Sequence, residues 1–228
     1  MTTRQVDAVI FDYGGVLTNA VADSIRAWHE ADGIDPGSFT RTLRAWLGRD
    51  VPVGTPVHRL ETGELSIAEF ETLLAAELTT VDGRPIEAEG ILGRLFAGMR
   101  ADAVMFDLVT ELREAGLKVG LLSNSWGNAY PRERIEALFD HIVISGEVGL
   151  RKPDPAIYRM SLTGLGVNPD RAVFIDDAEP NTLGAAALGM HTILHTSADE
   201  TRAALVDLIP DLITSPAAPA AAPANCTN

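Results

Sequence analysis

Five short apolar runs constrain the fold of this 228-residue chain more than any other feature of its sequence. They occupy residues 8–11, 118–122, 141–144, 172–175 and 191–194. None of the runs alternates regularly between apolar and polar residues, as a strand with one exposed face does. Each run therefore predicts a parallel strand that is covered on both faces.

Helical patterns precede each of the later runs, at residues 106–115, 131–139, 155–165 and 181–188. Gly116, Gly166 and Gly189 stand where the C-caps of three of these helices are expected, because glycine adopts the left-handed conformation that ends a helix. Strands that alternate with helices in this way predict an open, mostly parallel α/β sheet.

A long segment without a strand pattern separates the first apolar run from the rest of the sheet. It has helical patterns at residues 22–31, 38–47, 67–78 and 89–99. Ser66 and Glu69 form a capping-box pattern that starts the third of these helices. We therefore predict a core of residues 1–17 and 101–214, a helical insertion of residues 18–100, and a disordered Ala/Pro-rich tail of residues 215–228.

The charge of the chain excludes several classes of partner. It carries 32 acidic and 18 basic residues, which gives a formal net charge of −14. Such a surface repels nucleic-acid phosphates and anionic lipid headgroups, so we expect neither nucleic-acid binding nor membrane docking. A phosphorylated substrate would need local positive charge from a metal ion or a well-placed cation.

Cysteine content and apolar stretches indicate a cytoplasmic location. Cys226 is the single cysteine, which excludes intramolecular disulfides and cysteine-rich zinc sites and argues against thiol catalysis. No uninterrupted apolar stretch approaches twenty residues, and the first apolar run is too short for the core of a signal peptide.

Polar side chains follow the predicted strands in the middle of the sheet, where the carboxyl ends of parallel strands collect reactive groups. Taken singly, such residues are most often helix caps, turn formers or solvated charges. Two adjacent carboxylates at a buried strand end repel each other, however, and are better explained if they share a cation. The residues at successive strand ends are Asp12, Ser123, Asn124, Lys152, Asp176 and Asp177.

These residue types suit the transfer of a phosphoryl group. Asp12 and Asp176 offer the hard oxygen ligands that Mg²⁺ prefers. A second oxygen of Asp12 can attack phosphorus and form an aspartyl-phosphate. The Ser123 hydroxyl and the Asn124 backbone N–H can donate hydrogen bonds to phosphoryl oxygens. Lys152 can offset the charge of the transferring group and keep Asp12 ionised.

Four stretches of the chain resemble the ordered motifs of the haloacid dehalogenase superfamily. They are residues 11–18 (FDYGGVLT), 121–124 (LLSN), 149–155 (GLRKPDP) and 173–177 (VFIDD), and Asn181 also matches a position common in that family. The resemblance covers nearly the whole chain, including the insertion after the first motif. It implies a Rossmann-like three-layer core with a mostly parallel sheet and an inserted all-α cap.

The resemblance also implies a role for each motif residue. Asp12 would be the nucleophile, Ser123 would bind phosphate, and Lys152 would balance charge. Asp176 and Asp177 would be Mg²⁺ ligands.

One position departs from the family pattern. Most phosphatases of this family have a second aspartate two residues after the nucleophile, which acts as general acid and base, and here that residue is Gly14. The Gly14 carbonyl can still bind Mg²⁺, but it has no proton to give. The loss of such a group costs roughly 3 to 5 kcal/mol of barrier. Water, or a good leaving group such as that of a sugar 1-phosphate, would have to compensate.

Other branches of the family match less well. In metal-free dehalogenases the first motif reads Asp-x-Tyr, and the paired aspartates of the fourth motif are absent. Here Tyr13 is one position too early for that pattern, and Asp176 is followed by Asp177. Phosphonate-cleaving members need a cap lysine, but Lys118 and Lys152 are the two lysines of the chain. Phosphomutases need the acid–base aspartate that Gly14 replaces.

We expect residues of the predicted cap to determine which substrate binds. His58 or Arg59 could reach a substrate hydroxyl or a second phosphate, although the interpretation of Arg59 as a solvated charge is favoured. Trp28 and Trp46 are expected to be packing residues. Arg151, next to the motif lysine, could contact substrate or lie on the surface.

We therefore expect a Mg²⁺-dependent phosphatase, a monomer or homodimer, that acts on a small phosphorylated metabolite such as a sugar phosphate. Two alternatives stay open. One is a catalytically weak protein with a phosphate-ligand-binding or regulatory role, which lacks the general acid because residue 14 is glycine. The other is a haloacid dehalogenase.

Overall fold

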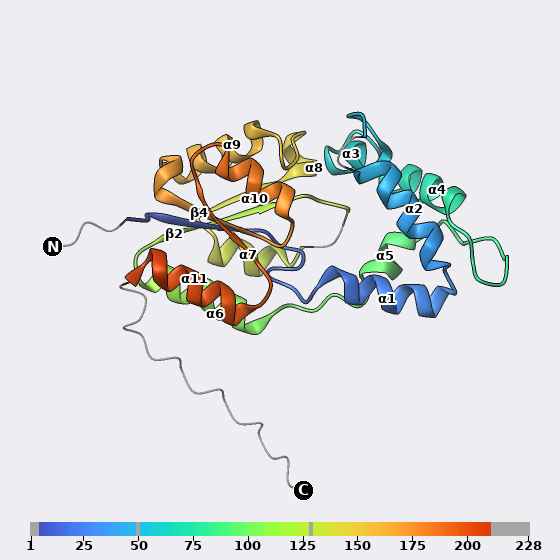
Figure 1. Ribbon diagram of the computed structural model, residues 1–228, viewed down its shortest axis with the longest axis horizontal. Coiled ribbons are helices and arrows are strands. Elements are labelled where there is room, and N and C mark those ends of the chain that lie inside the picture. The colour runs from blue at the N-terminus through green and yellow to red at the C-terminus, as the bar shows by residue number, and fades with distance from the viewer. Residues whose placement is uncertain (1–4, 49–50, 128–129, 211–228) are drawn as a thin grey trace, which may run out of the picture.

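The computed structural model describes residues 5–48, 51–127 and 130–210, and the predicted tail lies outside these residues. Its centre is a five-stranded parallel sheet in the order β3-β2-β1-β4-β5 (Figure 1). The strands are β1 (Ala8–Phe11), β2 (Lys118–Ser123), β3 (His141–Ile144), β4 (Ala172–Asp176) and β5 (His191–Leu194). All five predicted strands are confirmed, and β2 and β4 each run one residue further than predicted.

The strand register brings the site residues to one edge of the sheet. Phe11, the last residue of β1, lies opposite Leu121 of β2 and Ile175 of β4. The backbone N–H of Asp12 still donates to the Ile175 carbonyl at 2.9 Å, so the ladder continues for one residue past β1. Asp12 therefore leaves the middle strand of the sheet between the ends of its two neighbours.

Helices cover both faces of the sheet and make the predicted three-layer core. One apolar cluster joins the sheet to α6 (Ala103–Glu114), α7 (Arg132–Leu138) and α11 (Ala198–Leu208). A second cluster, on the other face, includes α9 (Pro155–Leu165) and α10 (Glu179–Ala186). Two short elements complete this part of the chain, α8 (Ser145–Val148) and the 3₁₀ helix η1 (Pro169–Arg171).

The helix predictions for the core are confirmed for α6, α7, α9 and α10; the bounds of α9 are as predicted, and the ends of the other three are shifted. The start of α6 is three residues earlier than predicted because the Asp102 carboxylate accepts from the Met105 N–H at 3.1 Å and caps the helix there. The helices α8 and α11 were not predicted.

Five helices lie between β1 and α6, and Figure 1 shows them at one end of the molecule, beyond the sheet. The capping box at Ser66 is present, whereas the predicted helix 89–99 is shorter at both ends and α3 was missed. Thr18 and Ala101 form an antiparallel bridge where the chain leaves and re-enters the core. The helices are α1 (Val21–Asp32), α2 (Pro36–Leu47), α3 (Pro56–Glu61), α4 (Ile67–Glu77) and α5 (Ile91–Phe96).

These five helices have their own apolar core, and a residue of the sheet-bearing part joins it. Phe70 of α4 is fully buried, and its ring lies 5.8 Å from Trp46 and 5.9 Å from Trp126. Trp126 comes from the loop after β2 and also contacts Phe96 of α5, at 6.5 Å between ring centroids. The loop that follows β2 is thus anchored among the inserted helices.

Trp28 is a packing residue as predicted, since its ring is 2% exposed and contacts Phe39. Within the described part of the chain, no helix has both the length and the apolar character needed to cross a lipid bilayer.

Replacing Phe70 with Ala should lower the free energy of unfolding by about 3 to 5 kcal/mol, because it removes a buried ring between two tryptophans and leaves a cavity. Urea unfolding followed by tryptophan fluorescence measures this change. Leu73→Ala on the same helix is the control, since Leu73 is 40% exposed and should cost less than about 1 kcal/mol. Equal losses for the two variants would contradict the packing described here.

Candidate active site

The ends of β1 and β4 bring two carboxylates to a buried lysine. The Lys152 ammonium lies 2.8 Å from Asp12 Oδ1 and 2.6 Å from Asp176 Oδ2. Lys152 and Asp176 are completely buried, and Asp12 is 8% exposed. Three predicted site residues from distant parts of the sequence therefore meet at one point.

This burial changes the proton affinity of both kinds of group. Burial, opposed by Lys152 and reinforced by Asp176, raises the pKa of Asp12 to about 7. Burial disfavours the charged form of Lys152, but Asp12 and Asp176 outweigh it and raise the pKa of that ammonium above its ordinary value. Lys152 therefore stays protonated, while Asp12 needs further positive charge to be fully ionised at neutral pH.

The donor set fits a hard divalent cation. Among the described residues, Asp12, Asp176 and Asp177 place carboxylate oxygens within 4.8 Å of one another. Lys152 neutralises one of these three negative charges, and two are left for a cation. Carboxylate oxygens are the ligands that Mg²⁺ takes in proteins, with water completing its shell.

Gly15 makes room for the third carboxylate. Its φ of +78° is a conformation that favours glycine, and a Cβ at this position would collide with the Asp177 carboxylate. Gly14 has no such constraint, since a Cβ there would meet only Val21 and Met99, at 3.5 and 3.9 Å. A larger residue is therefore compatible with the backbone at position 14.

Asp176 is held by several donors besides Lys152. Its Oδ1 accepts from the Ala178 N–H at 2.8 Å and from Asn181 Nδ2 at 3.0 Å. Asn181 also donates to Oδ2 at 3.1 Å. The asparagine that matches the family pattern thus orients the Asp176 carboxylate.

The side chain of Asn124 positions Lys152. Its Oδ1 accepts from the Lys152 N–H at 2.8 Å, and its Nδ2 donates to the Lys152 carbonyl at 3.1 Å. The sequence suggested a role for the Asn124 backbone N–H, and it gave no sign of this side-chain contact. Ser123 is buried beside the site, and its hydroxyl lies 3.0 Å from that of Tyr130, a neighbour the sequence did not reveal.

Glu61 of α3 joins the inserted helices to the loop that carries Lys152. Its carboxylate is 5% exposed and lies 2.5 Å from Arg151 Nε, and it accepts from Trp126 Nε1 at 2.7 Å. Asn124 Nδ2 approaches the same carboxylate at 3.4 Å. Arg151 therefore pairs with Glu61 of the insertion. The sequence suggested a substrate contact or a surface position for Arg151 and did not reveal this ion pair.

The structure does not bring Arg59 to this site. Arg59 is exposed on α3 and is not among the residues that line the cavity at Asp12. Residues two apart lie on opposite sides of an α-helix. The buried Glu61 therefore faces the core, while Arg59 faces outward. His58 is partly buried, and its Nδ1 accepts from the Gly54 N–H at 3.3 Å.

A cavity of about 150 Å³ opens above the nucleophile candidate. Asp12, Gly14, Ser123 and Asn124 form its polar end, and side chains of α1, α2 and α5 together with Met99 and Trp126 form the rest. A phosphoryl group in this cavity would contact a carboxylate, a hydroxyl and the donor set for a cation at the same time. The arrangement can therefore bind an anion next to a carboxylate.

Three known proteins are similar to this chain in sequence. The phosphatase MT3486 of Mycobacterium tuberculosis is 29% identical over 209 residues, which are 88% of this chain and 92% of that protein. The acyl-CoA dehydrogenase family member 10 of Mus musculus is 28% identical over 83% of this chain, and the chain spans only 18% of that relative's length. The bifunctional epoxide hydrolase 2 of Sus scrofa is 25% identical over 84% of this chain and 37% of its own.

Solved structures show the same fold. A predicted HAD-like family hydrolase of Porphyromonas gingivalis aligns with a TM-score of 0.64 and 25% identity over 90% of this chain and 98% of that one. A HAD family enzyme of Bacteroides thetaiotaomicron, in complex with magnesium and inorganic phosphate, aligns with a TM-score of 0.62 and 23% identity over 84% of this chain and 94% of that one. The family of haloacid dehalogenase-like hydrolases matches residues 6–189, and the chain belongs to that family.

Proposed function

We propose that the protein is a Mg²⁺-dependent phosphatase that hydrolyses a small phosphorylated metabolite through a phosphorylated Asp12. The observation that carries this proposal is the buried contact of Lys152 with both Asp12 and Asp176, next to a third carboxylate. The likeness to the phosphatase of Mycobacterium tuberculosis over most of both chains supports it.

The residues of the chain divide the reaction between them. A carboxylate oxygen of Asp12 forms a bond to phosphorus, the bond from phosphorus to the ester oxygen breaks, and the leaving oxygen takes a proton from water. Water then attacks the phosphorus of the aspartyl-phosphate, which releases inorganic phosphate and restores the Asp12 carboxylate.

The other site residues lower the barrier by charge and position. Lys152 stabilises the negative charge that develops on the transferring group, and Asn124 fixes the backbone of Lys152. The Ser123 hydroxyl is placed to donate to a phosphoryl oxygen. Asp12, Asp176, Asp177 and the Gly14 carbonyl would hold Mg²⁺, which when bound neutralises phosphoryl charge.

The inserted helices control what reaches this site. We propose that residues 18–100 form a cap domain on the core of residues 1–17 and 101–214. Side chains from α1, α2 and α5 line the cavity at Asp12, so the insertion is placed to decide which leaving groups fit.

Gly14 supports a second candidate function, that of a phosphate-ligand-binding protein with weak catalysis. The residue at this position has no proton to give, so turnover of esters with poor leaving groups would be slow. Saturable, metal-dependent turnover of a broad panel that includes sugar 1-phosphates distinguishes the enzyme from the binding protein. Halide release that persists in EDTA would instead indicate a dehalogenase.

Asp12→Asn should lower kcat for 4-nitrophenyl phosphate by more than about 10³-fold, because the amide is not a nucleophile. EDTA should abolish the activity of the unchanged protein, and added Mg²⁺ should restore it. Steady-state release of nitrophenol measures both effects. Asp107→Asn is the matched control, since this exposed residue of α6 lies outside the site. Turnover that survives in Asp12→Asn would overturn the proposal.

Mg²⁺ affinity should fall at acidic pH, because the metal must displace the proton from Asp12, whose pKa is raised to about 7 without metal. Below that pH, the apparent affinity should drop about tenfold for each pH unit. Calorimetric titrations with MgCl₂ between pH 5.5 and about 8.5 measure this dependence. An affinity that is constant across this range would show that Asp12 is not a ligand.

Gly14→Asp should raise kcat/KM for alkyl phosphates by about 10²-fold or more, because the new carboxyl group can protonate a poor leaving group. The gain for 4-nitrophenyl phosphate should be much smaller, since nitrophenolate leaves without a proton. Gly14→Ala is the control and should give no gain. An equal effect of Gly14→Asp on both esters would argue against missing acid catalysis.

A further inference from the structure

Beyond its polar end, the cavity at Asp12 has apolar walls. Beyond Gly14 and the polar strand-end residues, the lining consists of Val21, Ile25, Leu95, Phe96 and Met99, with Phe39, Leu43 and Trp126. The indole N–H of Trp126 is already committed to Glu61. A sugar in this space would lose water from its hydroxyl groups without gaining hydrogen bonds from these walls.

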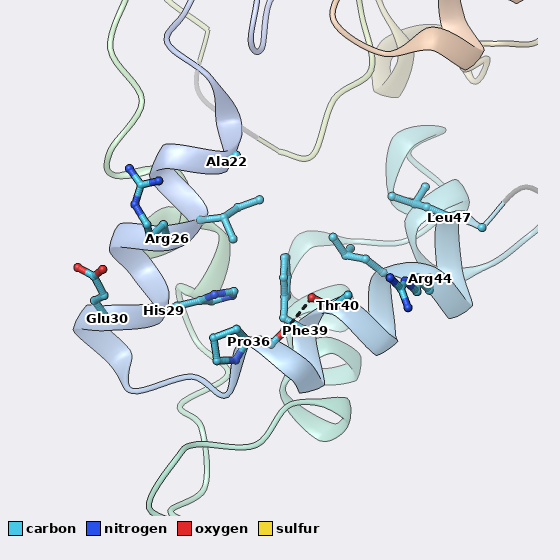
Figure 2. Close-up of a pocket in the computed structure, with 12 residues that line it drawn as sticks. Ala22, Arg26, His29, Glu30, Pro36, Phe39, Thr40, Arg44 and Leu47 are labelled. Atoms are coloured by element: carbon cyan, nitrogen blue, oxygen red, sulfur yellow. Dashed lines mark hydrogen bonds between the residues drawn. The ribbon is translucent and has the colours of Figure 1, made fainter.

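A groove of about 600 Å³ lies between α1 and α2. Ile25, Phe39 and Leu43 line both the groove and the cavity, so the two spaces share an apolar wall. Figure 2 shows the groove, and the rings of His29 and Phe39 contact each other between the two helices, edge to face. Their ring centroids are 5.0 Å apart.

Charged residues of the groove lie at its rim. Arg26, Glu30 and Arg44 are exposed. Arg26 and Glu30 point away from the space between the helices in Figure 2, and Arg26 pairs with Asp23. Burial lowers the pKa of His29, so its imidazole is neutral at physiological pH. The Thr40 hydroxyl donates to the Pro36 carbonyl at 2.8 Å. The groove thus offers its occupant mainly apolar contact.

The volumes assign different parts of a ligand to the two spaces. The inner cavity of about 150 Å³ equals the share of about five water molecules in the liquid. A phosphoryl group would occupy part of it, so only a short leaving group fits beside it and a longer one must extend into the outer groove. The groove in turn is large enough to receive a long chain or several fused rings.

We infer that the substrate is a phosphate monoester with an elongated apolar leaving group, such as an alkyl or terpenoid chain, which lies in the groove between α1 and α2. This inference rests on the proposed phosphatase function and defines its substrate class. It replaces the sugar phosphate as the expected substrate.

A series of n-alkyl phosphates tests the inference, because all members have the same reacting bond and differ only in chain length. From ethyl to octyl phosphate, kcat/KM should rise about twofold or more per methylene, roughly 60-fold in total. Glycerol phosphate, which is also the ester of a primary alcohol, should be turned over no faster than ethyl phosphate, and glucose 1-phosphate should be a poorer substrate than octyl phosphate. Concentrations are kept below those at which octyl phosphate forms micelles.

Two leucines of similar exposure provide matched variants. Leu47 lines the groove and is 38% exposed, whereas Leu73 lies on α4, outside both spaces, and is 40% exposed. Leu47→Asn should cut the octyl-to-ethyl ratio of kcat/KM at least about fivefold. Leu43→Asn, nearer to Asp12, should reduce it further. Leu73→Asn should leave the ratio unchanged.

The outcomes separate this inference from the proposed function. If 4-nitrophenyl phosphate and every alkyl phosphate resist turnover with Mg²⁺, the phosphatase proposal itself fails. If these esters are hydrolysed but chain length has no effect, or glucose 1-phosphate is the better substrate, only the inference about the leaving group is overturned. A dimer that dissociates in Leu47→Asn while chain length has no effect would show that a second copy covers the groove.

Discussion

The structure depends on a buried ammonium group that lies between two carboxylates. Lys152 is fully enclosed, and removing its charge from water costs several kcal/mol. Asp12 and Asp176, at 2.8 and 2.6 Å, compensate this cost and keep the lysine protonated. The two carboxylates still repel each other, however, and burial together with this repulsion raises the pKa of Asp12. The carboxylates of Asp12, Asp176 and Asp177 thus outnumber the ammonium group of Lys152 at the site.

The parallel sheet creates this arrangement from segments that are far apart in the chain. β1 lies between β2 and β4. Asp12 directly follows β1 and therefore lies between the carboxyl ends of β2 and β4. Asn124 after β2 holds the backbone of Lys152, and Asn181 in α10 holds Asp176. The charged centre is thus supported by amide side chains whose positions follow from the sheet.

The sequence predicted the sheet and the charged centre because both follow local rules. Apolar runs identify strands, and the carboxyl ends of parallel strands meet at one edge. The contacts of Glu61 with Arg151 and Trp126 could not be predicted, since Glu61 and Arg151 are separated by 90 residues and meet only when the insertion packs on the core. Helix α3 was missed because it has only six residues, too few to establish a periodic pattern. Arg59 was selected for its charge, whereas the direction of its side chain depends on how α3 packs.

The two halves of the site have opposite chemistry, and this contrast connects the fold to substrate choice. The strand ends of the sheet carry the charged and polar groups, and the inserted helices carry the apolar side chains that line the cavity and the groove. Glu61 and Trp126 join these halves, because α3 and the loop after β2 contact each other through them. A substrate that fills the groove would therefore be aligned with Asp12 by the same contacts that place the insertion on the core.

The most direct test of this account is acid quenching of the protein during turnover of 4-nitrophenyl phosphate with Mg²⁺, followed by peptide mapping with mass spectrometry. The account predicts one phosphoryl group on the peptide that contains Asp12, and its loss on treatment with hydroxylamine. A phosphoryl group on another residue, or retention of the Asp12 peptide in unmodified form throughout turnover under conditions that trap acyl phosphates, would contradict it.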